Sequence, residues 1–345
     1  MSCRLTILGS GSSGNCAYLE SDTTRLLVDA GLSARQIVDR LASIGKTPAD
    51  LQAILVTHEH ADHVQGLSVL ARKFHVPIYA NRLTREAILE NWRAAYGKDE
   101  GRKLVRPSFL PAVALAKEVS EGGMKSLPPS ELGDENEKDA APKTRGARRV
   151  GSDKSAKEEA LKWRIFESGQ CFPTGDFDIE PFSIPHDASD PMGFLIHHAG
   201  RSIAFLTDLG HMNHLTLEKA RKSHILLLET NHDTKLLQDD PRRPWAVKQR
   251  IAGRHGHLSN ESAATALAAI MSDRLEHVYL AHLSQDCNRP ELAEGTIRKK
   301  LGEMGASHVR LTVTHPNQPC ATERLEAAHK LEAETPSLFA RPAVE

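Results

Sequence analysis

The stretch Thr57-His58-Glu59-His60-Ala61-Asp62-His63 places three histidines and one aspartate within six consecutive positions. It follows the apolar run Ala53-Ile54-Leu55-Val56, which is typical of a buried strand that ends in a polar loop. Imidazole and carboxylate groups together suit Zn²⁺, Mn²⁺ or Fe. We therefore interpret the stretch as a metal-binding loop at a strand end, in preference to a chance cluster of some of the 18 histidines.

Short apolar runs and amphipathic stretches alternate around this loop. In the first hundred residues they predict strands at 4–8, 16–19, 26–29, 53–56 and 76–80, and helices at 33–44, 62–74 and 84–94. Residues 163–166, 177–184, 193–197, 202–206, 224–229, 277–281 and 309–313 predict further strands. Short strands in both halves with helices between them indicate an α/β sandwich of two mixed sheets flanked by helices. The loop 9–15 fits a hairpin turn at least as well as a phosphate-binding loop.

Composition sets wide limits on function. The chain has 345 residues and 40% hydrophobic content, which is enough for a full core. A formal net charge of −1 neither supports nor excludes a nucleic-acid substrate. The five cysteines are scattered and form no CxxC pair, which argues against a disulfide framework or a zinc ribbon. Without a signal-like N-terminus or a long apolar run, we expect a cytoplasmic protein with no membrane association.

Two segments differ in character from the rest. Residues 97–162 combine Gly, Pro and charged runs with few aromatics, so we expect a largely disordered insertion. Residues 318–345 contain no chemical motif, and we expect a flexible C-terminal tail there. The predicted organisation is therefore one hydrolase domain at 1–317, interrupted by the insertion and followed by the tail.

Three further polar residues end apolar strands in the second half. They are His186 after Ile184-Pro185, Asp208 after Ala204-Phe205-Leu206-Thr207, and His282 after Tyr279-Leu280-Ala281. Open sheets usually collect their functional groups at such strand ends. Taken singly, each residue fits equally well as a cap or as a hydrogen-bonded core residue.

The loop and these isolated residues together resemble the metallo-β-lactamase superfamily, and several strings resemble its YycJ/WalJ-like branch of metal-dependent nucleases. The strings are 8–16 (LGSGSSGNC), 28–33 (VDAGLS), 229–233 (ETNHD) and 256–260 (GHLSN). The resemblance covers about 1–97 and 163–315. It implies an αββα sandwich with a two-metal site at one edge.

By the same resemblance, seven residues would hold two divalent metal ions, Zn²⁺ or Mn²⁺. His58, His60 and His186 would hold one ion, Asp62, His63 and His282 the other, and Asp208 would bridge them. Attack by a metal-bound hydroxide then implies hydrolysis, with Asp62 also orienting that hydroxide. His257 would act as proton donor or phosphate contact, although a helix-capping loop also explains it. His232 is a weaker candidate for supporting the ligands or contacting substrate.

The branch implies a phosphodiesterase acting on nucleic acid, DNA more than RNA, most plausibly a 5′→3′ exodeoxyribonuclease. The alternatives are a small-molecule phosphodiesterase or (thio)esterase, an RNase Z-like ribonuclease, and a metal-binding regulatory protein. The interval from Asp208 to His282 is too short for the large domain of RNase J-type nucleases, and no RNase Z arm is evident. A basic stretch at 242–254 with one tryptophan fits either a phosphate grip or a solvated helix face. The sequence leaves the oligomeric state open.

Overall fold

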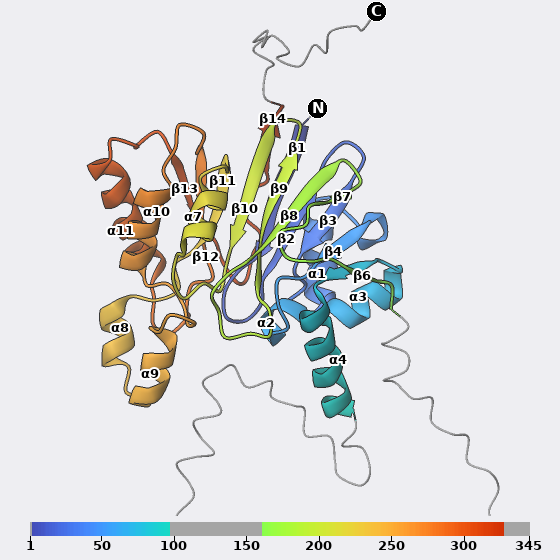
Figure 1. The fold of residues 1–345 in the computed structure, drawn as a ribbon, viewed down its shortest axis with the longest axis horizontal. Coiled ribbons are helices and arrows are strands. Elements are labelled where there is room, and N and C mark those ends of the chain that lie inside the picture. The colour runs from blue at the N-terminus through green and yellow to red at the C-terminus, as the bar shows by residue number, and fades with distance from the viewer. Residues whose placement is uncertain (1, 97–160, 328–345) are drawn as a thin grey trace, which may run out of the picture.

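The computed structural model describes residues 2–96 and 161–327, which form two seven-stranded sheets packed face to face (Figure 1). The first sheet and its helices comprise β1 (Ser2–Gly9), β2 (Cys16–Glu20), β3 (Arg25–Val28), α1 (Ala34–Ser43), η1 (Pro48–Asp50), β4 (Ala53–Leu55), α2 (Ala61–Val64), α3 (Leu67–Phe74), β5 (Ile78–Ala80), α4 (Arg82–Tyr96), β6 (Trp163–Ile165) and β14 (Glu323–Glu326). The second comprises β7 (Phe172–Thr174), β8 (Phe177–Ser183), β9 (Met192–His198), β10 (Arg201–Leu206), α7 (His214–Ala220), β11 (Ile225–Glu229), α8 (Thr234–Asp239), α9 (Trp245–Ile251), α10 (Asn260–Ile270), β12 (His277–Ala281), α11 (Pro290–Glu303) and β13 (Arg310–Val313).

Both sheets have one antiparallel half and one parallel half. The first sheet runs in the order β14-β1-β2-β3-β4-β5-β6, with β3 to β6 parallel. The second runs in the order β13-β12-β11-β10-β9-β8-β7, with β10 to β13 parallel. Parallel strands place their carboxyl ends along one edge of a sheet, where α/β proteins usually bind ligands. In Figure 1 this is the lower edge of the sandwich, beside α2.

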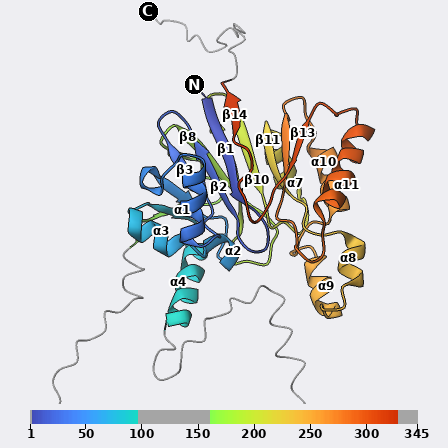
Figure 2. The same ribbon diagram turned by 180° about the vertical axis from the view of Figure 1, so that it is seen from behind.

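Apolar residues on neighbouring positions of a strand pack into different layers. In β3, Leu26 belongs to the core between the two sheets, and Leu27 to the core beneath the helices of the first half. In β11, Leu227 faces the inter-sheet core, whereas Leu228 packs under α10 and α11. Strands covered on both faces read as continuous hydrophobic runs. The predicted αββα sandwich is therefore confirmed, with helices outside both sheets (Figures 1 and 2).

The predicted helix 62–74 is wrong in one respect, because it is divided into α2 and α3. Gly66 lies at the division, and a Cβ there would meet the Leu32 carbonyl oxygen at 2.5 Å. Its amide also donates to the Ala30 carbonyl oxygen at 2.8 Å. The chain therefore bends to pack against the loop that follows β3.

The predicted C-terminal tail, 318–345, starts too early in the sequence. Residues 318–327 are part of the described chain, and Glu323–Glu326 form β14, which pairs antiparallel with β1 (Figure 2). The short β7 is a second strand that the sequence pattern did not predict. The insertion expected at 97–162 falls, apart from its last two residues, outside the described residues. Within 2–96 and 161–327, no helix has the length and apolar character needed to cross a membrane.

Candidate metal centre

The histidine loop joins β4 to α2 and carries four of the predicted residues. His60 stands at the N-cap of α2, and its carbonyl oxygen accepts from the His63 amide at 2.9 Å. This first helical turn places Asp62 and His63 within the helix while His58 precedes it. His58 and His63 are completely buried. The short turn therefore presents several side chains from one rigid strand-to-helix junction.

The structure brings all seven predicted metal-site residues together. Donor atoms of His58, His60 and His186 lie within 4.8 Å of one another. The same limit holds for a second group, which consists of Asp62, His63, Asp208 and His282. Asp208 lies between the groups, since its Oδ1 is 3.8 Å from Nε2 of His186 and its Oδ2 is 2.9 Å from Nε2 of His63.

Three residues near the centre, each just after the end of a strand, have a left-handed backbone conformation. The φ angles are 60° at Asp29 after β3, 59° at Asp208 after β10 and 56° at His282 after β12. This backbone conformation is unfavourable for residues other than glycine. Residues that adopt it are concentrated at functional sites. The turn redirects each side chain at the point where its strand ends.

The first group contains a buried nitrogen with no partner. Nε2 of His58 makes no hydrogen bond, although a buried polar atom normally has one. Burial, followed by the neighbouring His63 and His60, holds the pKa of His58 well below its ordinary value. His58 is therefore neutral, which is the form of imidazole that binds a metal ion.

The carboxylates of the second donor group favour a positive charge at the site. Burial opposes protonation of His63, but the carboxylates of Asp208, Asp29 and Asp62 raise its pKa well above the ordinary value. Oδ2 of Asp208 makes no hydrogen bond despite its close approach to His63. Buried carboxylates that converge without satisfied hydrogen bonds form a suitable cradle for a cation. The donor set therefore fits divalent metal ions.

Asp29 supports the centre from behind, and we did not predict this from the sequence. Its Oδ2 lies 2.7 Å from Nδ1 of His63, and its Oδ1 accepts from the Thr57 amide at 2.8 Å. A carboxylate on Nδ1 fixes the ring so that Nε2 faces the site. The motif at 28–33 contains this residue, so the signal was present without an assigned role.

Glu229 at the end of β11 is a second supporting residue that we did not predict. Its Oε1 lies 2.7 Å from Nδ1 of His257 and 2.9 Å from Nδ1 of His282. Its Oε2 accepts from the amides of Leu209 and Leu258. Burial works against its ionisation, but His257 and His282 lower its pKa to about 2. A completely buried carboxylate thus orients two imidazoles at once.

His257 lies beside both groups. Its ring centroid is 5.1 Å from that of His186 and 5.3 Å from that of His282. Its side chain retains 22% exposure, whereas those of His186 and His282 retain 1% and 3%. Of these three imidazoles, His257 is therefore the most accessible to a substrate.

His232 is buried outside the two groups. Its backbone forms an isolated parallel bridge with Ser259, and its Nδ1 makes no hydrogen bond. Burial lowers its pKa to about 4, with Glu229 acting in the opposite direction. Glu229 is close enough to affect the pKa of His232. However, His232 is not among the described residues that form the clusters of possible metal donors.

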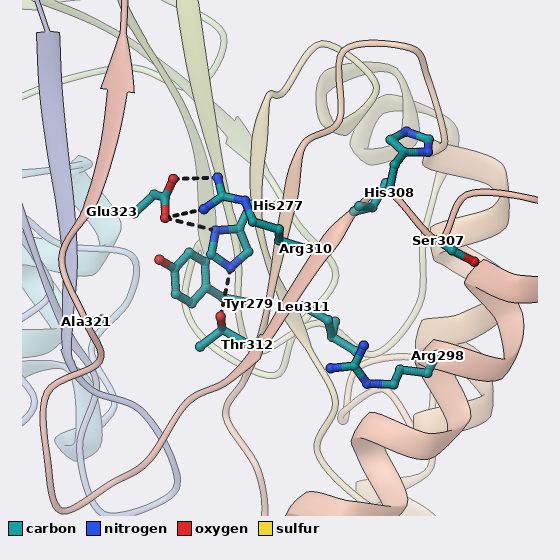
Figure 3. A pocket seen from close by; sticks show the side chains of 11 residues that line it. His277, Tyr279, Arg298, Ser307, His308, Arg310, Leu311, Thr312, Ala321 and Glu323 are labelled. Atoms are coloured by element: carbon teal, nitrogen blue, oxygen red, sulfur yellow. Dashed lines mark hydrogen bonds and ion pairs between the residues drawn. The ribbon is translucent and has the colours of Figure 1, made fainter.

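A separate cavity of about 420 Å³ lies at the other end of β12 (Figure 3). His277 begins this strand and donates to or accepts from Thr312 at 2.8 Å, depending on its tautomer. Arg310 on β13 pairs with Glu323 on β14 through both terminal guanidinium nitrogens. Figure 3 shows this network between β13 and β14, which are edge strands of the two sheets. None of the predicted functional residues lines this cavity.

Comparisons with known proteins agree with the fold and the centre. A family model described as "Metallo-beta-lactamase superfamily" matches residues 9–153, and one described as "Beta-lactamase superfamily domain" matches 140–282. The solved metallo-beta-lactamase fold protein YhfI from Bacillus subtilis has a TM-score of 0.56 at 12% identity, covering 92% of this chain and 99% of its own. The chain belongs to the metallo-beta-lactamase superfamily.

Two curated relatives indicate the branch of the superfamily that the chain resembles. The chain is 32% identical to exodeoxyribonuclease YycJ of Bacillus anthracis, over 88% of this chain and 91% of the relative. It is 34% identical to exodeoxyribonuclease WalJ of Streptococcus pneumoniae serotype 2, over 87% and 88% respectively. The resemblance to this branch is therefore confirmed. The superfamily and the clustered donors together indicate divalent-metal binding.

Proposed function

We propose that this metal-dependent hydrolase cleaves phosphodiester bonds of DNA from the 5′ end. The observation that carries the proposal is the pair of donor groups with Asp208 between them and His257 beside both. Two adjacent divalent cations suit phosphodiester chemistry because they activate water and neutralise charge on the phosphoryl group. The names of the YycJ and WalJ relatives support DNA as the substrate.

We assign the ligands as the donor groups suggest. His58, His60 and His186 would hold one ion, and Asp62, His63 and His282 the other, with Asp208 between them. Zn²⁺ and Mn²⁺ both suit mixed imidazole and carboxylate donors. The unpartnered nitrogen of His58 supports this assignment.

His257 would supply the proton for the departing oxygen. Its Nδ1 points to Glu229, so Nε2 is the nitrogen available to a substrate. Burial disfavours its protonated form, but Glu229 raises its pKa above the ordinary value. A protonated imidazole at working pH is suited to act as general acid. Asp62, whose side chain is 23% exposed, would orient the attacking water.

The first experiment is degradation of end-labelled single- and double-stranded DNA and RNA with added Mn²⁺ or Zn²⁺. We expect progressive shortening of DNA from its 5′ end. Asp208→Ala should abolish it, while the matched control His214→Ala, whose side chain is 92% exposed on α7, should leave it unchanged. Persistence of cleavage in Asp208→Ala would contradict the proposed centre.

The second candidate function is hydrolysis of a small phosphodiester, and the metal-centre geometry serves it equally. Bis(p-nitrophenyl) phosphate measures this chemistry without any contact along a polymer. If the wild type cleaves this compound and leaves every polymer intact, the small-molecule function is the better account. Shortening of RNA in preference to DNA would instead favour a ribonuclease.

A further inference from the structure

Helix α9 carries an isolated, highly exposed tryptophan beside the metal centre. Trp245 is 66% exposed, the largest value among the exposed large hydrophobic side chains of the described residues. Figures 1 and 2 show α8 and α9 projecting beyond the same edge of the sandwich that carries α2. Burial of an indole normally contributes strongly to stability, and Trp245 does not make that contribution.

The other end of α9 is tied directly to the centre. The carbonyl oxygen of Gly256 lies 3.1 Å from Nδ1 of His186, and Arg250 pairs with Asp187. The His257 amide donates to the Ile251 carbonyl oxygen at 2.8 Å. The seven residues of α9 span about 10 Å at 1.5 Å per residue. Trp245 therefore lies about 10 Å along α9 from the end that contacts the centre, a length equal to about three stacked nucleotides at 3.4 Å each.

The segment around Trp245 is cationic. Residues 240–256 hold five cations and one carboxylate, namely Arg242, Arg243, Lys248, Arg250, Arg254 and Asp240. Asp240 and Asp286 pair with Arg242 and Arg243. Lys248 and Arg254 have no carboxylate partner in the described part of the chain: Lys248 donates to the Gln238 carbonyl oxygen, and Arg254 contacts His211. These two cations are available to phosphate groups.

The exposed surface of α9 is otherwise not apolar. Its other exposed residues are Ala246, Gln249 and Arg250, and within the described residues no other large exposed hydrophobic lies on α8 or α9. Protein-docking surfaces usually bury a cluster of apolar side chains. A single aromatic ring flanked by cations instead matches the way single-stranded nucleic acid is held without sequence preference.

We propose that α9 is a stacking platform for single-stranded DNA. Trp245 stacks on a base of the strand whose scissile phosphate lies in the metal centre, and Lys248 and Arg254 contact the intervening backbone. The inference rests on the proposed nuclease function and specifies how that function selects a strand. It requires the substrate to be single-stranded over this interval, because paired bases present no free face to the indole.

Steady-state kinetics of the metal-loaded protein test the proposal. Trp245→Ala should raise KM for single-stranded DNA by about tenfold, within the range for loss of one stacked base, and Trp245→Phe should restore most of the affinity. Neither variant should change hydrolysis of bis(p-nitrophenyl) phosphate, which is too small to reach α9. Leu215→Ala, on α7 at 40% exposure, is the matched control for removal of an exposed hydrophobic side chain.

Binding provides an independent readout. Of the three tryptophans, Trp92 is buried, Trp163 is partly buried and Trp245 is exposed. A phosphorothioate oligonucleotide should therefore quench tryptophan fluorescence more in the wild type than in Trp245→Ala. Lys248→Ala should reduce the slope of log affinity against log salt by about one. Unchanged DNA kinetics in Trp245→Ala would overturn the stacking platform while leaving the nuclease intact. A wild type that cleaves only the small phosphodiester would overturn the nuclease function itself.

Discussion

Oε1 of Glu229 lies 2.7 Å from Nδ1 of His257, and the same oxygen lies 2.9 Å from Nδ1 of His282. One buried carboxylate therefore orients both the proposed proton donor and a proposed ligand. Glu229→Gln replaces an acceptor oxygen with an amide donor that faces an N–H group. We expect metal affinity and activity to fall by about 10- to 100-fold, as when other outer-shell partners are removed.

Calorimetric metal titration and kcat measurement check this prediction. The matched control is Glu180→Gln, a half-buried carboxylate on β8 that pairs with Lys219. The control should bind metal like the wild type. Wild-type affinity and activity in Glu229→Gln would show that the two imidazoles hold their orientation without the carboxylate.

Gly31 is a position where one methyl group should disturb the centre. An added Cβ would lie 1.6 Å from the Asp62 carbonyl oxygen and 2.7 Å from the Asn15 nitrogen. Gly31→Ala must therefore displace the histidine loop, and we expect a loss of about 1–3 kcal/mol in unfolding free energy together with weaker metal binding. Chemical denaturation and metal titration measure both effects.

Gly295→Ala serves as the opposite control. Nothing lies within 4 Å of a Cβ at this position inside α11. Alanine should raise the unfolding free energy by about 0.5–1 kcal/mol because it is the better helix former. Equal effects of the two substitutions would refute the steric account of Gly31.

Metal removal should destabilise the protein. The centre gathers Asp29, Asp62, Asp208 and Glu229, which repel one another in the absence of cations. A chelator should lower Tm, and metal should restore it, with each tenfold excess of free metal over Kd adding about 1.4 kcal/mol. Differential scanning calorimetry in Asp208→Ala should show a smaller metal effect. Identical Tm values with and without metal in the wild type would contradict divalent-metal binding.

His277 should give the fold a pH dependence remote from the metal centre. Burial, followed by Arg310, lowers its pKa to about 4, below the unfolded value of about 6.5. Between these two values the His277 imidazole is protonated in the unfolded chain but not in the folded chain. The free energy of unfolding therefore falls as pH drops from about 6.5 to about 4. Above this window the group contributes no pH dependence.

The measurement compares urea unfolding of the wild type and His277→Gln at pH 7, 6 and 5. The difference between the two curves removes groups that titrate in both proteins. We expect the wild type to lose more stability than the variant on acidification. Parallel losses would place the pH dependence elsewhere.

Most of the candidate metal site could be predicted from polar residues at the ends of apolar strands. His186, Asp208 and His282 each follow an apolar run, and parallel strands bring such ends together at one edge. The histidine loop added a dense local signal. Which residues form each donor group came from the resemblance, because spacing along the chain does not determine distances between separate strands.

The supporting residues were harder to predict. Asp29 and Glu229 contact the imidazoles through oxygens whose positions depend on β3 and β11 lying beside strands that are distant in sequence. The division of the expected helix at Gly66 also depends on a tertiary contact, with Leu32. Local periodicity contains no information on either contact. β14 was missed because three of its four residues are charged, which resembles a solvated tail until β1 is placed beside them.

The pairing of the first and last described strands has a consequence for biosynthesis. Ser2 pairs with Glu326, and Leu5 with Glu323, so β1 has an open hydrogen-bonding edge until the end of the sheet-forming chain has been translated. Exposed strand edges recruit other chains. A chain that ends before residue 323 would therefore leave this edge unpaired and be prone to aggregation.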